Sequence, residues 1–295
     1  MDTEALRTFV IIARTGGFSG AAEQMGRSQP AISRRIALLE AELGMPVFER
    51  LAGGVTLSQA GEALLPHAER VLAALEDASS AMRVLQVGEG GPISVAVVGT
   101  LAGADLAQAL KRFAGQFPKV ALTLRTATSV QVTDLVRRGE ATLGLRYFED
   151  PSPDLENRAC APEALVVVCA PDHRLAGGEV ASLRDLRNEP WLGFPPPEGR
   201  DERWSGMLSA QFLTRGVAEA RFTAVDSLTA QKRLVEAGFG LALMPVSAVA
   251  EERAAGSLAV IAVADLAVSN PVSLITRKGG YVSPAAQGLI EALTA

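Results

Sequence analysis

The sequence contains little of several residue types that mark whole classes of protein. Its 295 residues include two cysteines and two histidines, too few for a disulfide framework or a metal site with recognisable ligand spacing. No apolar run reaches the roughly 18 residues of a membrane-spanning helix. Two acidic residues, Asp2 and Glu4, precede the first apolar stretch, and this argues against a signal peptide. We therefore expect a protein of the reducing cytoplasm, with no membrane partner, metal or other cofactor.

Catalytic motifs are missing as well. The chain has no Gly-x-Ser-x-Gly elbow, zinc motif or phosphate-binding loop. Gly238-Phe239-Gly240 is only a fragment of a dinucleotide-binding fingerprint, and it follows a predicted helix instead of a strand. An enzyme is therefore not predicted. Cys160 and Cys169 allow two interpretations, small core residues or a peroxide-sensing pair, and we favour the first.

The stretch Ser19–Leu43 predicts two short helices separated by a tight break at Met25-Gly26-Arg27. Ser28 is a suitable N-cap for the second helix, and Pro30 falls in its first turn, where a missing N–H costs little. An apolar stripe follows the second helix at helical spacing, through Ile32, Ile36, Leu39 and Leu43.

The other side of this second helix carries hydroxyl, amide and guanidinium groups, which read base edges and phosphates in a major groove. The pattern predicts a helix-turn-helix that binds double-stranded DNA, with Gln29, Ser33 and Arg34 contacting bases. The remaining predicted DNA-binding residues, mainly phosphate contacts, are Arg27, Pro30, Arg35 and Arg50. Residues 1–58 hold six arginines, six acidic residues and no lysine, in a chain of net charge −5. DNA affinity must therefore come from the positions of the arginines rather than from bulk charge.

Helix and hairpin signals flank this motif. Apolar residues at positions 6, 9, 10 and 13 predict an amphipathic helix that precedes the motif and ends near Gly16-Gly17. Gly44 is a natural stop for the second helix of the motif. Two short apolar stretches within residues 46–57 surround Gly53-Gly54, which predicts a β-hairpin. Residues 1–58 are therefore predicted to form a mainly α, winged helix-turn-helix domain.

A long linker helix is predicted over residues 59–87, with Ser58 as its cap. Its apolar residues are spaced as an a/d heptad, at Leu64, Ala68, Val71, Leu75, Ala78, Met82 and Leu85. Such a narrow stripe predicts a dimerisation helix, with contacts through Leu64, Ala68, Val71, Leu75 and Met82. The alternative is a helix that lies on its own domain.

From residue 92 onward, predicted strands and helices alternate, which indicates an α/β domain with mostly parallel sheets. Strands are predicted near residues 93–98, 120–125, 143–146, 164–170, 191–194, 219–224, 240–244, 257–263 and 272–276. Helices are predicted at 102–117, 130–138 and 228–237, after Ser182 and from Pro284. In open α/β sheets, ligands lie beyond the carboxyl ends of strands, where helix N-termini offer N–H groups.

Small hydroxyl residues follow three of these strands and are candidate effector contacts, namely Thr100, Thr128 with Ser129, and Ser227. The alternative is that each is simply an N-cap, because Ser and Thr are favoured there.

Two further residues are candidate effector contacts. Arg146 could pair with a carboxylate ligand or with Glu149 or Asp150 on the following loop, and both options stay open. Phe194, beside three prolines, could supply an apolar wall. Together these candidates predict a small, anionic organic ligand.

The N-terminal sequence, over residues 6–50 and the following TLSQAGEALLP, resembles the DNA-binding region of LysR-type transcriptional regulators. The rest of the chain is similar in layout to the co-inducer domain of that family. The resemblance implies two subdomains within residues 92–295, arranged as in a periplasmic solute-binding protein. They comprise residues 92–162 with 268–295, and residues 163–267. It also implies linker helices that pair into dimers, homotetramers that bend promoter DNA, and a small effector held between the subdomains.

The chain is thus predicted to be a DNA-binding transcriptional regulator whose promoter binding or bending responds to a small effector. Contact with RNA polymerase stays open. One alternative is an effector-independent repressor with a vestigial ligand cleft. Another is a transport binding protein, which would need a secretion signal and would not need a DNA-reading head.

Overall fold

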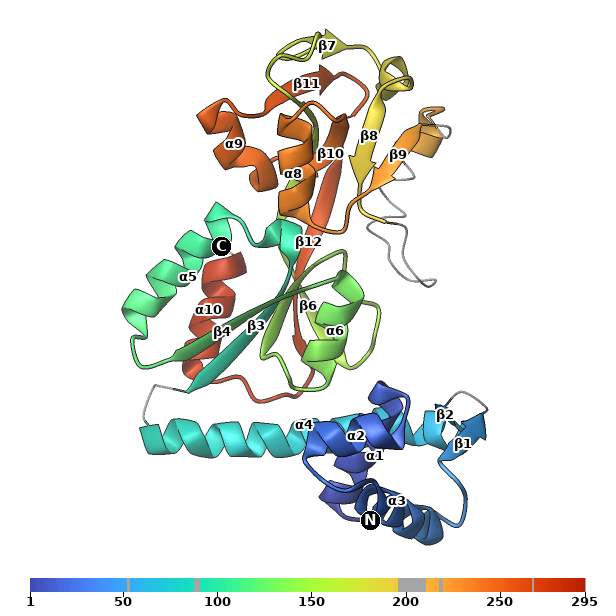
Figure 1. Cartoon of the computed structure of the whole chain (residues 1–295). Helices are drawn as coiled ribbons and strands as arrows, with labels where there is room; N and C mark the ends of the chain where they lie inside the picture. The colour runs from blue at the N-terminus through green and yellow to red at the C-terminus, as the bar shows by residue number, and fades with distance from the viewer. Residues whose placement is uncertain (52–53, 88–90, 196–210, 218–219, 267, 295) are drawn as a thin grey trace. The chain divides into compact units, whose positions relative to one another are not determined.

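The structure, a computed structural model, describes residues 1–51, 54–87, 91–195, 211–217, 220–266 and 268–294. The chain divides into two compact units (Figure 1), the first over residues 1–86 together with 137–140, and the second over the remainder. Within the described ranges, no helix combines the length and apolarity needed to cross a membrane.

Three helices open the first unit: α1 (Thr3–Thr15), α2 (Phe18–Met25) and α3 (Gln29–Leu43). α2 ends at Gly26, whose φ of 60° lies in the left-handed region that favours glycine, so the chain turns sharply before α3 begins. The predicted helix-turn-helix is confirmed. One detail differs, because Ser28 occupies the N-cap position of α3 without accepting a capping hydrogen bond through its side chain.

The apolar stripe of α3 forms the core of this head. Ile32, Ile36 and Leu39 are almost fully buried and belong to one cluster with Phe9 of α1 and Ala21 of α2. Burying a large aliphatic side chain contributes about 1.5–3 kcal/mol. This packing therefore fixes which side of α3 is turned inward and leaves its polar side outward.

The predicted hairpin and linker helix complete the first unit. β1 (Phe48–Leu51) and β2 (Gly54–Leu57) pair antiparallel, and α4 (Gln59–Val87) follows. Ser58 caps α4 as predicted, since its Oγ accepts the N–H of Gly61 at 3.1 Å. The head and most of α4 thus belong to one compact unit.

A mixed sheet of ten described strands organises the second unit, and its main order is β4-β3-β5-β12-β6-β10-β8-β9. The first half of the unit contains β3 (Pro92–Val98), η1 (Gly99–Leu101), α5 (Ala104–Gln116), β4 (Ala121–Ala127), α6 (Ser129–Arg137), β5 (Leu143–Tyr147), β12 (Ser269–Arg277) and α10 (Pro284–Thr294). The second half contains β7 (Glu179–Val180), η2 (Leu183–Leu186), β8 (Pro190–Gly193), β9 (Arg221–Ala224), α8 (Leu228–Glu236), β10 (Leu241–Pro245), η3 (Ser247–Val249), α9 (Ala250–Ala255) and β11 (Ala259–Val263). We call these halves subdomain 1 and subdomain 2.

One strand joins the two subdomains. β6 (Leu155–Cys169) pairs with β12 from Leu155 to Ala164, and from Leu165 onward it pairs with β10 and β11. Each subdomain buries its own apolar core, with Leu143 and Leu274 in the first and Trp191 and Leu241 in the second.

The sheet differs from the mostly parallel one that the sequence predicts. β3, β4 and β5 run parallel to one another, as do β8, β9 and β10, but β12 and β6 pair antiparallel between these two groups. The helix predicted after Ser182 is a four-residue 3₁₀ turn, η2. Three segments were not predicted, namely the first half of β6, the whole of β7 and the whole of α9. These segments lack a clean apolar period.

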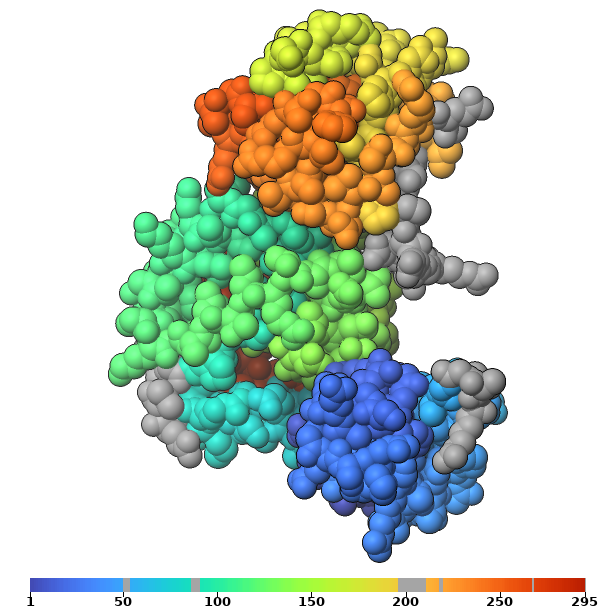
Figure 2. Space-filling view, in the orientation of Figure 1, coloured from blue at the N-terminus to red at the C-terminus, as the bar shows by residue number. Residues whose placement is uncertain are grey.

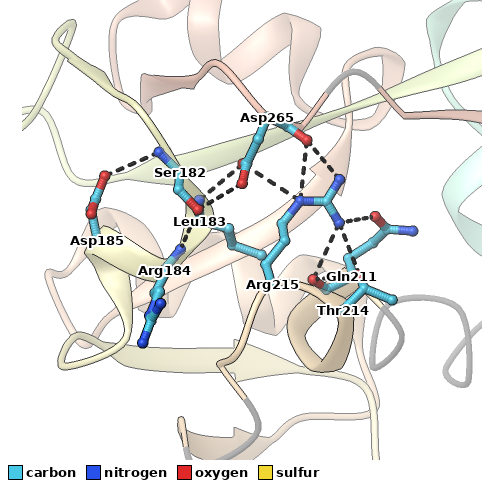
Figure 3. A network of polar contacts seen from close by, with 8 residues as sticks. All are labelled: Ser182, Leu183, Arg184, Asp185, Gln211, Thr214, Arg215 and Asp265. Atoms are coloured by element: carbon cyan, nitrogen blue, oxygen red, sulfur yellow. Dashed lines mark hydrogen bonds and ion pairs between the residues drawn. The ribbon is translucent and has the colours of Figure 1, made fainter.

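Asp265 ties three segments of subdomain 2 together (Figure 3). Its carboxylate accepts hydrogen bonds from Ser182 Oγ at 2.6 Å and from the N–H of Leu183 at 3.0 Å, and its carbonyl accepts from Arg215 Nη2 at 2.6 Å. Burial works against ionisation of this carboxyl, but the Ser182 and Leu183 hydrogen bonds and the charge of Arg215 outweigh it. The pKa of Asp265 therefore lies below its ordinary value.

Candidate nucleic-acid interface and effector site

The polar side of α3 is exposed where the sequence predicts DNA contacts. Arg27, Gln29, Pro30 and Arg34 are exposed, and Ser33 is half-buried. The space-filling view shows α2 and α3, in blue, at the surface of the head (Figure 2). A helix that is apolar on its packed side and carries amide, hydroxyl and guanidinium groups on its open side is suited to reading a major groove.

Arg35 and Arg50 are the other two arginines that the sequence predicts as phosphate contacts. Arg35 lies against α1, with its Nη1 atom 3.4 Å from Thr8 Oγ1 and 3.7 Å from Glu4 Oε2. Its guanidinium therefore links α3 to α1 within the head. Arg50 belongs to β1, and its side chain lies outside the part of the chain that the structure describes.

The predicted dimerisation stripe of α4 divides into two parts. Leu64 and Ala68 pack into the core of the head, where Ala68 is only 1% exposed. Ala68 is therefore wrongly predicted as a dimer contact: its side chain already has an intramolecular partner, as in the alternative of a helix lying on its own domain. Further along α4, Val71, Leu75 and Met82 are 43%, 42% and 55% exposed, so this part of the stripe stays open.

The effector candidates of subdomain 1 follow neighbouring strand ends. Thr100 comes two residues after β3, and Thr128 comes directly after β4, whose last residue pairs in register with Val98. Arg146 lies in β5, next to the residue that pairs with Val97 of β3. Parallel pairing thus brings these residues to one edge of the sheet.

The candidates of subdomain 2 are arranged in the same way. Phe194 follows β8, and Ser227 precedes α8 after β9, whose last residue Ala224 pairs with Gly193. η3 follows the adjacent parallel strand β10. A methyl group placed on Gly103, just after η1, would lie 3.6 Å from the Ser247 carbonyl oxygen. The strand ends of the two subdomains therefore face each other at η1 and η3, as ligand sites in open α/β folds require.

Three of the four candidate hydroxyls have local roles. Thr100 Oγ1 lies 2.8 Å from the Tyr147 hydroxyl, Thr128 Oγ1 accepts the N–H of Gln131 at 3.3 Å, and Ser227 Oγ accepts that of Ala230 at 3.3 Å. The N-cap interpretation holds for Thr128 and Ser227. The fourth hydroxyl, Ser129 Oγ, is enclosed and makes no hydrogen bond with any described residue.

Arg146 takes the intramolecular option. It is only 5% exposed, and its guanidinium forms an ion pair with Asp150 and donates to Thr133 Oγ1 at 2.9 Å. Burial alone would raise the pKa of Asp150, but hydrogen bonds from Ser152 and Thr133 and the charge of Arg146 hold it below its ordinary value. The structure thus favours the Asp150 ion pair over an effector contact for Arg146.

Sequence reasoning missed several buried or half-buried polar residues near the subdomain junction. Ser247 Oγ donates to Glu163 Oε2 at 2.8 Å, and Tyr147 is buried beside Thr100. Asn270 is fully buried, and its side-chain amide has no hydrogen-bond partner among the described residues. The rule that marked Thr100 could have found Ser247, which also follows a strand, whereas Asn270 lies inside a strand and gives no signal.

The two cysteines fit the core interpretation better than the redox one. Cys169 is fully buried, and burial together with the charge of Asp172 raises its pKa to about 11. Burial also raises the pKa of Cys160. Reactive thiols need a lowered pKa, because the thiolate is the nucleophile.

The fold and these surfaces define a class: a winged helix-turn-helix DNA-binding protein that carries a two-lobed α/β ligand-binding domain. Comparison with known families agrees. Residues 3–62 match the model described as bacterial regulatory helix-turn-helix protein, lysR family, and residues 86–295 match the LysR substrate binding domain. The chain belongs to the LysR family of bacterial transcriptional regulators. It is a DNA-binding regulator with an effector-binding domain, and its relatives are regulators, not enzymes.

Individual relatives support this assignment over nearly the whole chain. The chain is 30% identical to the regulator CbbR of Rhodospirillum rubrum, covering 98% of this chain and 95% of that protein. It is also 30% identical to TfdS of Cupriavidus pinatubonensis, covering 93% and 92%. Among solved structures, full-length CbnR complexed with its target DNA is 27% identical, with a TM-score of 0.65 and 99% of each chain covered.

Proposed function

We propose that α3 is the recognition helix, with Gln29, Ser33 and Arg34 contacting bases and Arg27 contacting phosphate. The supporting observation is the exposed polar side of α3, held outward by the buried stripe Ile32, Ile36 and Leu39. The similar structure of CbnR was solved with its target DNA, which supports the same use of this head.

Arg34→Ala tests this assignment. Duplexes selected from a random library by the wild-type chain serve as probes in anisotropy titrations. We expect the variant to lose about 1–3 kcal/mol of binding free energy and to relax the preference at one base position. Arg7→Ala is the matched control, because Arg7 is an exposed arginine of α1 that pairs with Glu4. Equal losses in both variants, without relaxed base preference, would contradict the assignment.

We also propose that the chain forms a homodimer through the open part of the α4 stripe, and a homotetramer that bends promoter DNA. Val71, Leu75 and Met82 leave an apolar strip that a second α4 would cover. Leu75→Glu should dissociate the dimer in sedimentation velocity. Arg70→Glu, which places the same carboxylate about 140° around the helix, should not. RNA polymerase is a further partner in this proposal.

The proposed effector is a small organic anion bound where the strand ends of the two subdomains face each other. The enclosed Ser129 Oγ, which has no hydrogen-bond partner among the described residues, carries this proposal. It lies at the start of the nine-residue helix α6, and helix N-termini favour anions. Calorimetry with a panel of small mono- and dicarboxylates should identify a ligand. Ser129→Ala should then weaken it by about 1.5–3 kcal/mol, whereas Ser79→Ala on α4 should not.

A second function is kept because three of the four candidate hydroxyls already have partners within the chain. In that case the protein is a repressor that binds DNA without an effector, and its cleft is vestigial. Failure of every carboxylate in the panel to bind the wild-type chain or change its DNA affinity would favour this alternative.

A further inference from the structure

The backbone of Val47, between α3 and the wing, is held from both sides. Its N–H donates to Glu40 Oε1 on α3 at 2.9 Å, and its carbonyl accepts the N–H of Ser58 at 3.1 Å. The Val47 side chain is fully buried. A buried backbone N–H needs a partner, and here that partner is a side chain of the recognition helix.

Ser58 connects the same segment to the linker helix. Its hydroxyl donates to the Pro46 carbonyl at 2.7 Å and accepts the N–H of Gly61 at 3.1 Å. A single side chain therefore binds the segment after α3 and caps the first turn of α4. Ser58 is itself only 5% exposed, so water competes little for these hydrogen bonds.

Gly61 brings the first turn of α4 into direct contact with Val47. A Cβ atom at position 61 would lie 2.1 Å from the Val47 carbonyl oxygen and 2.9 Å from a Leu57 methyl carbon. Only glycine permits this approach, because the carbonyl oxygen and the α4 backbone could shift only at a large cost in free energy. The start of α4 is thus held against the backbone segment that Glu40 binds.

We propose that Glu40 is a positioning residue that, through Val47, Ser58 and Gly61, sets the orientation of the recognition helix relative to α4. This inference rests on the proposed functions of α3 in reading bases and of α4 in dimerisation. In a dimer held by α4, that orientation determines the separation of the two recognition helices. Glu40 would therefore control the preferred spacing of DNA half-sites without touching a base.

Half-site spacing is a sensitive readout of this geometry. Adding or removing one base pair displaces a half-site by about 3.4 Å along the duplex and about 35° around it. A rigid head should discriminate against this displacement, whereas a head whose recognition helix is free to pivot should tolerate it. Loss of a merely structural contact would lower stability without changing the ratio of affinities between spacings.

Three substitutions separate the hydrogen bond from the charge. Glu40→Gln keeps the side-chain length and an acceptor oxygen but removes the charge. Glu40→Asp keeps the charge but is one methylene too short to reach the Val47 N–H, and Glu40→Ala removes both. Glu42→Ala is the control, since Glu42 is exposed on the same helix and pairs with the N-terminal amine of Met1.

The experiment titrates the full-length chain with selected duplexes whose half-sites are at the natural spacing or one base pair closer or further apart. We expect wild type, Glu40→Gln and Glu42→Ala to lose at least about tenfold in affinity on altered spacing, and Glu40→Asp and Glu40→Ala to lose less than about threefold. Wild-type discrimination that persists in folded Glu40→Asp overturns this inference alone. A wild-type chain that shows no spacing preference overturns both it and the proposed dimeric mode of DNA binding.

Discussion

The two units of this protein present their functional groups in opposite ways. In the head, the proposed base contacts come from one helix, α3, and Gln29 and Arg34 are exposed on its surface. In the second unit, the candidate effector contacts come from strands distant in sequence, and most of their polar groups are already used. Thr100 contacts Tyr147, and Arg146 pairs with Asp150.

This contrast follows from what each unit has to bind. A recognition helix must leave its polar groups free for a partner as large as DNA. A domain that encloses a small molecule has to bury polar groups even when empty, and each of them needs a hydrogen bond or an ion pair. Residue type alone therefore indicates function better in the head than in the second unit.

The largest effect that would sharpen the contrast concerns the buried ion pair of the second unit. Asp150→Ala leaves Arg146 charged, buried and without this carboxylate, and should reduce the free energy of unfolding by about 3–5 kcal/mol. Urea denaturation measures the change. Glu149→Ala is the control, because Glu149 is exposed. If both variants lost the same small amount, the ion pair would not be a structural element of the unit.

A second prediction tests the division of the α4 stripe. Ala68→Glu should destabilise the head by several kcal/mol, because it places an unpaired charge in an apolar core where Ala68 is 1% exposed. Val71→Glu, at the neighbouring stripe position, should leave the head folded and weaken only self-association. Circular dichroism melts combined with light scattering distinguish the two. If Ala68→Glu dissociated the dimer while the head stayed folded, Ala68 would be a dimer contact after all.

Acid pH should affect the second unit by a smaller amount. The pKa values of Asp150 and Asp265 are lowered in the folded state, so their ionised forms stabilise the fold above the unfolded pKa of about 4. This stabilisation is lost as the pH falls through the lower folded values. Unfolding free energies measured between pH 5 and pH 2.5 (about 25 °C) should decline less steeply in Asp265→Asn than in wild type. An unchanged slope would contradict the hydrogen-bond assignment in Figure 3.

The smallest effect is expected for the cysteines. With a pKa of about 11 for Cys169, only about one thiol in ten thousand is ionised at neutral pH. Peroxide treatment of the folded chain should therefore leave Cys169 unmodified, as measured by mass spectrometry. It should also leave DNA affinity unchanged, in wild type as in the Cys169→Ala control. The urea-unfolded chain, in which both thiols are accessible, serves as the positive control. Rapid oxidation of the folded chain would revive the peroxide-sensing interpretation.

Much of the head could be predicted because its determinants are local. The period of Ile32, Ile36 and Leu39 defines the buried side of α3, and Gly26 marks the turn before it. In the second unit, apolar runs predicted most strands. They did not predict that β6 would continue across both subdomains, because after Leu155 its first half is exposed or half-buried, without a regular apolar period.

The sequence by itself determined the class of this protein, the exposed polar side of α3 and the cap of α4, since each depends on residues within a few turns of one another. Only the tertiary structure decided which part of the α4 stripe stays open, which partner Arg146 takes and that Glu40 binds the Val47 backbone, which contacts the start of α4. Those outcomes depend on contacts between segments far apart in the chain. Helical or strand periodicity predicts which side chains will be buried, but it does not predict which segments will pack against them.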